Sequence, residues 1–234
     1  MCFSAPASFG VSTALLPIGA FTLTYAMRHD RRYLALAAFP LLFSAQQGFE
    51  GVLWLSITAE GATGLTPSAL GFLFFAYLLW PFFVPFAANR VETDPSRQGV
   101  FRWFTVIGLL FGLSLYLPLL INPEWLTVSL SRHSILYEPV LIYDGIVSRT
   151  VVRVFYAVLV SIPLLFSTVV SLRHFGIMIV ISVIFSAVFF VYAFVSVWCF
   201  FAAVLSLYVV IVLRKGEKLP ARSGRCRDAS TTRS

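Results

Sequence analysis

The chain has 234 residues, of which 59% are hydrophobic and 12% are charged, and its mean hydropathy is +0.89. Soluble globular domains are about 45–50% apolar and about 25% charged, so this composition excludes a soluble globular domain and a disordered protein. The net charge of +7 does not indicate nucleic-acid binding, because no basic domain lies outside the apolar segments. We expect a membrane protein whose first partner is the lipid bilayer.

Seven apolar runs are long enough to cross a bilayer core of about 30 Å, which requires roughly 20 residues per helix. The runs are continuously apolar rather than alternating, which disfavours a β-barrel. The predicted fold is therefore an all-α bundle of seven transmembrane helices within residues 1–214, and prolines inside the first five runs favour kinked helices around a cavity. In chain order the runs are Phe9–Met27, Tyr33–Ile57, Pro67–Ala88, Val100–Ile121, Thr150–Leu172, Phe175–Tyr192 and Ala193–Leu213.

The second run contains a polar helical face. Gln46, Glu50 and Trp54 are spaced four residues apart, and Gln47 precedes Glu50 by three, so all four side chains share one face. We expect this face to point into the bundle, because lipid offers no hydrogen bonds. Inserting an ionisable side chain into a span costs about 2.5–3.5 kcal/mol, which makes Glu50 a candidate ligand-binding or catalytic residue. The alternative is a structural network in which the glutamines join helices.

Later runs add further candidates for a ligand pocket. Trp80 begins a kinked aromatic segment of the third run, and Trp198 lies in the seventh run. Arg153 lies about one turn into the fifth run and is the natural counter-charge for Glu50. Its alternative role is an arginine whose head group extends to the membrane interface. The connection 122–149 is the one long loop, and we expect a short hairpin or an irregular lid there.

Basic residues are distributed unequally between the two sides of the predicted bundle. Fourteen of the 17 Lys and Arg residues fall in three alternate loops and in the tail 215–234, including its junction with the seventh run, whereas Arg132, Arg149 and Arg153 fall on the other side. Because basic loops stay in the cytoplasm, the N-terminus should lie outside and the C-terminus inside. The tail is basic, small and polar, so we expect it to be disordered.

The cysteines suggest a metal site on the outer side. Cys2 lies at the N-terminus and Cys199 lies near the outer end of the seventh run, where Glu50 and the loop residue His133 could join them. Thiolate, imidazole and carboxylate donors suit zinc or another transition metal. A disulfide between Cys2 and Cys199, or two unconnected structural cysteines, are the alternatives.

Three motifs together resemble a known family. They are the opening segment Met1–Ala5, the pattern Gln46-Gln47-x-x-Glu50-Gly51 with Trp54, and the segment Val197–Ala203. The chain is similar over Met1 to about Leu213 to a bacterial family of seven-span membrane proteins with no established activity. The resemblance implies a multi-pass protein of the bacterial inner membrane and supports the choice of Cys2, Glu50 and Cys199, but it implies no reaction.

These observations favour a membrane sensor or binding protein. Its outward-facing polar pocket, around Glu50, Cys2 and Cys199, would take a metal or a small or lipophilic ligand. One alternative is a metal- or thiol-dependent enzyme acting on a lipid or small molecule, with Glu50 as general base. A second alternative is an ion- or proton-coupled transporter that uses Glu50.

Overall fold

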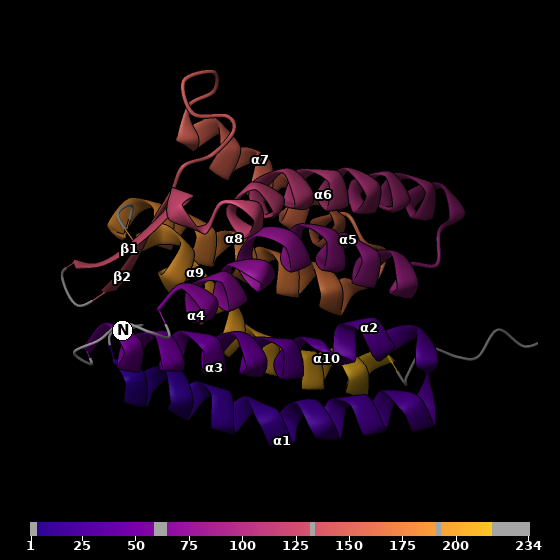
Figure 1. Cartoon of the computed structure of the whole chain (residues 1–234). Coiled ribbons are helices and arrows are strands. Elements are labelled where there is room, and N and C mark those ends of the chain that lie inside the picture. The colour runs from indigo at the N-terminus through magenta and orange to yellow at the C-terminus, as the bar shows by residue number, and fades with distance from the viewer. Residues whose placement is uncertain (1–3, 59–64, 132–133, 191–192, 217–234) are drawn as a thin grey trace, which may run out of the picture.

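The structure, a computed structural model, describes residues 4–58, 65–131, 134–190 and 193–216. Apart from one two-stranded sheet, the regular structure of these residues is helical (Figure 1). The longer elements are α1 (Ala5–His29), α3 (Phe39–Thr58), α4 (Leu65–Leu73), α5 (Trp80–Val91), α6 (Pro95–Ile121), α7 (Arg149–Leu165), α8 (Val170–Phe189), α9 (Phe194–Leu205) and α10 (Val209–Gly216). The shorter ones are η1 (Arg31–Tyr33), α2 (Leu34–Ala37), η2 (Phe74–Leu79), η3 (Pro123–Trp125), β1 (Leu126–Ser131), β2 (Ser134–Pro139) and η5 (Ser206–Tyr208).

Within the described residues, five helical segments are long and apolar enough to cross a membrane. They are Ala5–His29, Pro67–Val91, Pro95–Ile121, Val170–Phe189 and Phe194–Arg214. Two further helices, α3 and α7, overlap the second and fifth predicted runs, but α7 ends at Leu165, seven residues before the predicted end of its run. Helix α3 contains two glutamines and a glutamate, and α7 has only 17 residues. Helix α3 is therefore too polar, and α7 too short, to be counted among the membrane-crossing segments. Both helices nevertheless pack against other helices of the bundle.

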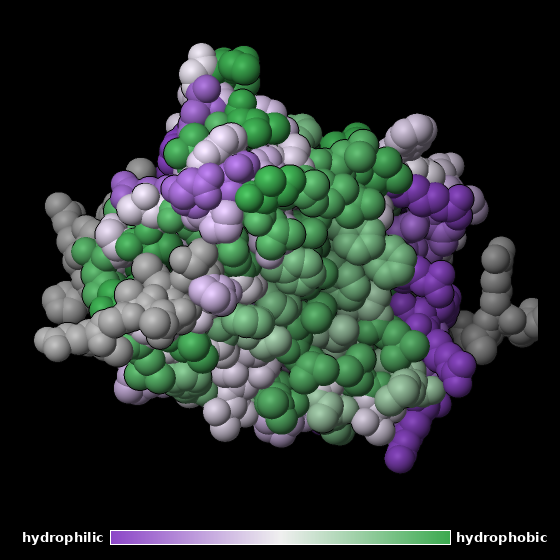
Figure 2. Space-filling view, in the orientation of Figure 1, coloured by the Kyte–Doolittle hydropathy of each residue, from purple (hydrophilic) through white to green (hydrophobic). Residues whose placement is uncertain are grey.

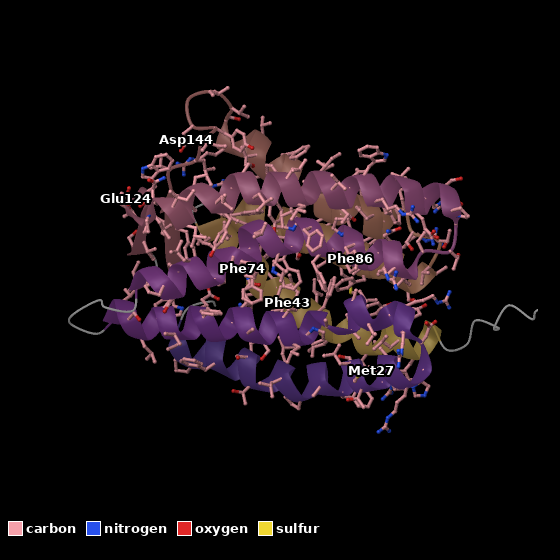
Figure 3. All side chains as sticks on the ribbon, turned by 45° about the vertical axis from the view of Figure 1, so that its right-hand side comes forward. Met27, Phe43, Phe74, Phe86, Glu124 and Asp144 are labelled. Carbon is pink, nitrogen blue, oxygen red and sulfur yellow. The ribbon has the colours of Figure 1, made fainter. Side chains whose placement is uncertain are left out.

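The helices form a bundle in which α3 runs beside α1 and also contacts α9. Helix α5 packs against α6 and α7, and α8 packs against α7 and α9. Figure 2 shows a broad apolar surface over the middle of the bundle, with a hydrophilic band at the end where the α1–α2 and α5–α6 connections lie. Figure 3 places Met27 near that end and places Glu124 and Asp144 at the opposite end. We call these the basic end and the hairpin end.

Proline interrupts the regular helix in the segment from α4 to α5. Pro81 is the second residue of α5, and the residues before it, Phe74–Leu79, form the π-helical segment η2. Proline has no N–H to donate to the carbonyl of the preceding turn, so the regular hydrogen-bond ladder cannot continue there. The carbonyl of Ala76 in η2 instead accepts a hydrogen bond from the Tyr156 hydroxyl of α7 at 2.5 Å. This hydrogen bond joins α7 to the α4–α5 segment.

Glycine allows α6 to lie directly against this segment. A Cβ atom built on Gly108 would lie 1.9 Å from the carbonyl oxygen of Pro81, and one built on Gly112 would lie 2.9 Å from the carbonyl oxygen of Tyr77. These distances leave no room for a side chain. Close approach of backbones through small residues is the usual means of packing membrane helices.

The loop after α6 forms the predicted hairpin. Strands β1 and β2 pair antiparallel, from Leu126 opposite Pro139 to Ser131 opposite Ser134. Ile135 and Tyr137 are buried on the bundle, and the Tyr137 ring stacks on Phe72 of α4 with centroids 5.0 Å apart. The hairpin therefore covers the end of the bundle opposite the basic loops.

Candidate functional site

The polar face of α3 points into the bundle, as its spacing predicts. Gln46, Gln47 and Glu50 have no exposed surface, and Trp54 is 6% exposed. The intervening Phe49 is exposed and faces outward. Helical periodicity thus separates a polar inner face from an apolar outer face on the same helix.

Two long-range hydrogen bonds connect this face to other helices. The Ser196 hydroxyl of α9 donates to Glu50 Oε1, and Trp80 Nε1 donates to Gln46 Oε1 at 2.8 Å. The Gln47 amide lies beside the Glu50 carboxyl, and the Gln46 amide lies beside the Cys199 thiol. The sequence placed these residues on three separate predicted helices, and the fold joins them in one buried cluster.

Several polar atoms of this region lack a hydrogen-bond partner among the described residues. They are Gln46 Nε2, both side-chain polar atoms of Gln47, Glu50 Oε2 and Trp198 Nε1. A buried donor or acceptor without a partner costs about 1–3 kcal/mol, so such a concentration is unusual in a purely structural network. Ordered water is a common partner of such buried atoms.

A cavity of about 80 Å³ lies at the hairpin end, between η2, the hairpin, α7 and α9. We call it the outer cavity. Its polar lining includes Arg149, Arg153, Tyr77 and Trp198, and the Cys199 side chain also lines it. The volume exceeds the roughly 10–15 Å³ that one water molecule requires. The outer cavity can therefore hold several waters or a small chemical group.

A second cavity of about 30 Å³, here the inner cavity, lies deeper in the bundle. Its lining is almost wholly apolar and includes Phe43, Trp80 and Phe175. Three residues line both cavities, namely Tyr156, Trp198 and Cys199. The two spaces are thus separated by one shared wall of side chains from α7 and α9.

Arg153 and Glu50 do not form an ion pair in the described structure. The Arg153 guanidinium lies 5.7 Å from the centre of the Phe194 ring, in a cation–π arrangement, and faces the outer cavity. Glu50 lies behind the cavity wall, lines neither cavity and takes its hydrogen bond from Ser196. The sequence could not predict this separation, because spacing along one helix does not determine which helix it faces.

The metal hypothesis involves residues that the structure describes only in part. Cys2 and His133 lie outside the described residues. Cys199 is a buried free thiol next to the Glu50 cluster. Among the described residues, no group of three or more His, Cys, Asp or Glu side chains could hold a metal ion. The metal and disulfide alternatives stay predictions.

Sequence reasoning overlooked part of the outer cavity lining. Arg149, Arg153 and Tyr156 are spaced by four and three residues on α7, so their helical periodicity could have identified a second polar face. Arg149 is held at the cavity edge by Asp144, at 2.9 Å, and by the Pro139 carbonyl. Tyr77 gave no comparable signal, because its position depends on the π-helical segment.

A second buried carboxylate, Glu92, was also missed and lies at the basic end. It accepts hydrogen bonds from the Ser167 hydroxyl at 3.0 Å and the Thr168 amide at 2.8 Å, and also from Thr93 and Asp94 amides of its own loop. Burial raises the pKa of Glu92, but these hydrogen bonds outweigh it and leave the pKa below the ordinary value. Glu92 therefore joins the α5–α6 and α7–α8 loops, which is a structural role.

One family model matches most of the chain. A family of unknown function, DUF6629, matches residues 1–225. The chain belongs to this family. No curated protein and no solved structure matches the chain. Membership of DUF6629 agrees with the resemblance inferred from the motifs and adds no activity.

Proposed function

We propose that this DUF6629 protein is a multi-pass membrane binding protein whose ligand occupies the outer cavity. The proposal includes seven spans, an external N-terminus and hairpin, a cytoplasmic C-terminus, and residence in the bacterial inner membrane. The excess of basic residues at the end opposite the hairpin supports this orientation. In this orientation, the outer cavity lies at the end of the bundle that faces away from the cytoplasm.

The observation that supports binding most directly is the lining of the outer cavity. Two arginines, Arg149 and Arg153, line a space that is otherwise surrounded mostly by apolar side chains. A concave, mostly apolar pocket with a few convergent polar groups is the usual form of a small-molecule site. Glu50 lines neither cavity, which favours binding over an enzyme that uses Glu50 as general base on a cavity ligand.

The test uses a neutral polarity-sensitive fluorophore, 1-aminoanthracene, with the protein in phosphatidylcholine nanodiscs. We expect saturable binding above that of protein-free discs. Val195→Phe, which enlarges a side chain lining the outer cavity, should weaken binding. The matched control Val188→Phe changes an exposed residue of α8 and should bind as the parent does. Fluorescence no greater than that of protein-free discs would refute the proposed function.

A further inference from the structure

We infer that the outer cavity selects a single-chain amphipathic anion, with a carboxylate or phosphate head group and an apolar chain. This inference deepens the proposed function and rests on it. It follows from three features of the cavity, which are its charge, a neutral hydrogen-bond donor and its apolar lining.

The charge lining the outer cavity is positive. Arg153 has no ion-pair partner among the described residues, and Arg149 shares its charge with Asp144. The charged groups at the cavity are thus two guanidinium groups and one carboxylate, while Glu50 lies behind the wall. A guanidinium presents two parallel N–H donors that match a carboxylate or a phosphate. An anionic head group would complete the charge balance at Arg153.

One neutral donor adds to these charges. Tyr77 lines the outer cavity together with Arg149 and Arg153, and its phenol can donate a hydrogen bond. The Trp198 ring also lines the cavity, but its Nε1 atom is itself buried. A head group with several oxygen atoms could accept hydrogen bonds from the phenol and from the guanidinium of Arg153 together. A head group with one hydroxyl would offer fewer acceptors to these donors.

The rest of the outer cavity lining is apolar. Leu115, Val152 and Val195 contribute aliphatic side chains to it. Apolar surface favours an apolar chain, at about 0.8 kcal/mol for each buried methylene group. A small inorganic anion would leave this surface unused. The combination therefore favours an amphiphile over free phosphate.

A membrane arginine can also bind the phosphates of bilayer lipids at the interface. The two sources of an anionic head group, a soluble amphiphile and a bilayer phospholipid, differ in a testable way. If phospholipid occupies Arg153, adding phosphatidylglycerol to the nanodisc should displace the fluorophore without any added amphiphile. If the cavity takes a single-chain anion, phosphatidylglycerol should leave fluorophore binding unchanged.

The experiment compares octanoate, octyl phosphate and octanol as competitors of 1-aminoanthracene in phosphatidylcholine nanodiscs at neutral pH. We expect the parent protein to prefer one or both anions over octanol. Arg153→Gln should lower the ratio of anion affinity to octanol affinity roughly 10- to 100-fold, because it removes a charged hydrogen-bond donor. Arg173→Gln, which removes an exposed charge at the basic end, should leave the ratio unchanged.

The outcomes distinguish failure of the proposed function from failure of this inference. If the fluorophore does not bind, both the proposed function and this inference are wrong. If it binds but the anions compete no better than octanol, only this inference is wrong. An unchanged ratio in Arg153→Gln would likewise overturn the assignment of the head group. Displacement by phosphatidylglycerol alone would replace the single-chain ligand with a bilayer lipid.

Discussion

Glu50 and Ser196 lie 146 residues apart in the chain, and the serine supplies a hydrogen bond to the buried carboxyl. Spacing on α3 was enough to predict that Glu50 is buried. It was not enough to identify its partner, since Ser196 was one of several small residues on the seventh run. The residue scale therefore offers three tests, two at Glu50 and its partner Ser196 and one at the other buried carboxyl group, Glu92.

Ser196→Ala should lower the free energy of unfolding by about 1–3 kcal/mol, because it removes a donor from a buried acceptor. Denaturation in detergent measures the change. Ser182→Ala is the matched control, because buried Ser182 donates only to the Ile179 carbonyl of its own helix. Equal losses in the two variants would show that the Ser196–Glu50 hydrogen bond contributes nothing specific.

Glu50→Gln tests the hypothesis that the sequence suggested, in which Glu50 is essential for binding. We expect the chain to fold, because glutamine keeps the shape of the side chain and can still accept from Ser196. The sequence hypothesis predicts loss of 1-aminoanthracene binding in this variant. Normal binding would instead place the site at Arg153 and Trp198 alone, which line the outer cavity as Glu50 does not.

Glu92 predicts a component of acid sensitivity. Its pKa in the folded protein lies below the ordinary value of 4.5, so its ionised form stabilises the fold above about pH 4.5. This stabilisation is lost as the pH falls from about 4.5 through the lower folded pKa. Glu92→Gln should lower Tm at neutral pH and reduce the loss of stability below pH 4.5. Glu124→Gln, at an exposed position, should match the parent.

At the scale of elements, the contact between α5 and α6 depends on the absence of a side chain at Gly108. Gly108→Ala would place a methyl group 1.9 Å from the Pro81 carbonyl oxygen and force the helices apart. We expect destabilisation by about 1–3 kcal/mol, measured as a lower Tm in detergent.

Gly99→Ala is the matched control in the same helix. A Cβ atom at Gly99 meets no atom within 4 Å, so the better helix propensity of alanine should leave stability equal or raise it by up to about 1 kcal/mol. A similar Tm in both alanine variants would contradict the close α5–α6 contact.

At the scale of the whole molecule, the proposed orientation predicts which end faces outward. Ile146→Cys, in the exposed turn at the hairpin end, should react with a membrane-impermeant maleimide added to intact cells. Ser96→Cys, at the start of α6, should react only after the membrane is opened. The parent, with its own three cysteines, gives the background. Labelling of Ser96→Cys in intact cells would reverse the orientation.

The sequence by itself determined a mostly helical chain with helices long enough to cross a membrane, and the burial of the α3 polar face. Each of these follows from local composition or periodicity, which persists whatever the neighbouring helices are. For the loop after α6 the sequence left open a short hairpin or an irregular lid, and the structure shows the hairpin. The sequence also predicted that most basic residues lie at one end of the bundle, because successive helices run in opposite directions and alternate loops therefore fall on the same side. It did not establish how many helices span the membrane, since α3 is polar and α7 is short.

Only the tertiary structure decided which side chains line the outer cavity. Periodicity shows which residues share a face of one helix, but the contacts between helices depend on steric fit at positions such as Gly108 and on the irregular segment before Pro81. That packing turned Arg153 toward Phe194 rather than Glu50, and brought Trp198 and Tyr77 to the same cavity. Long-range packing therefore places the Glu50 carboxylate behind the cavity wall and the Arg153 guanidinium in front of it.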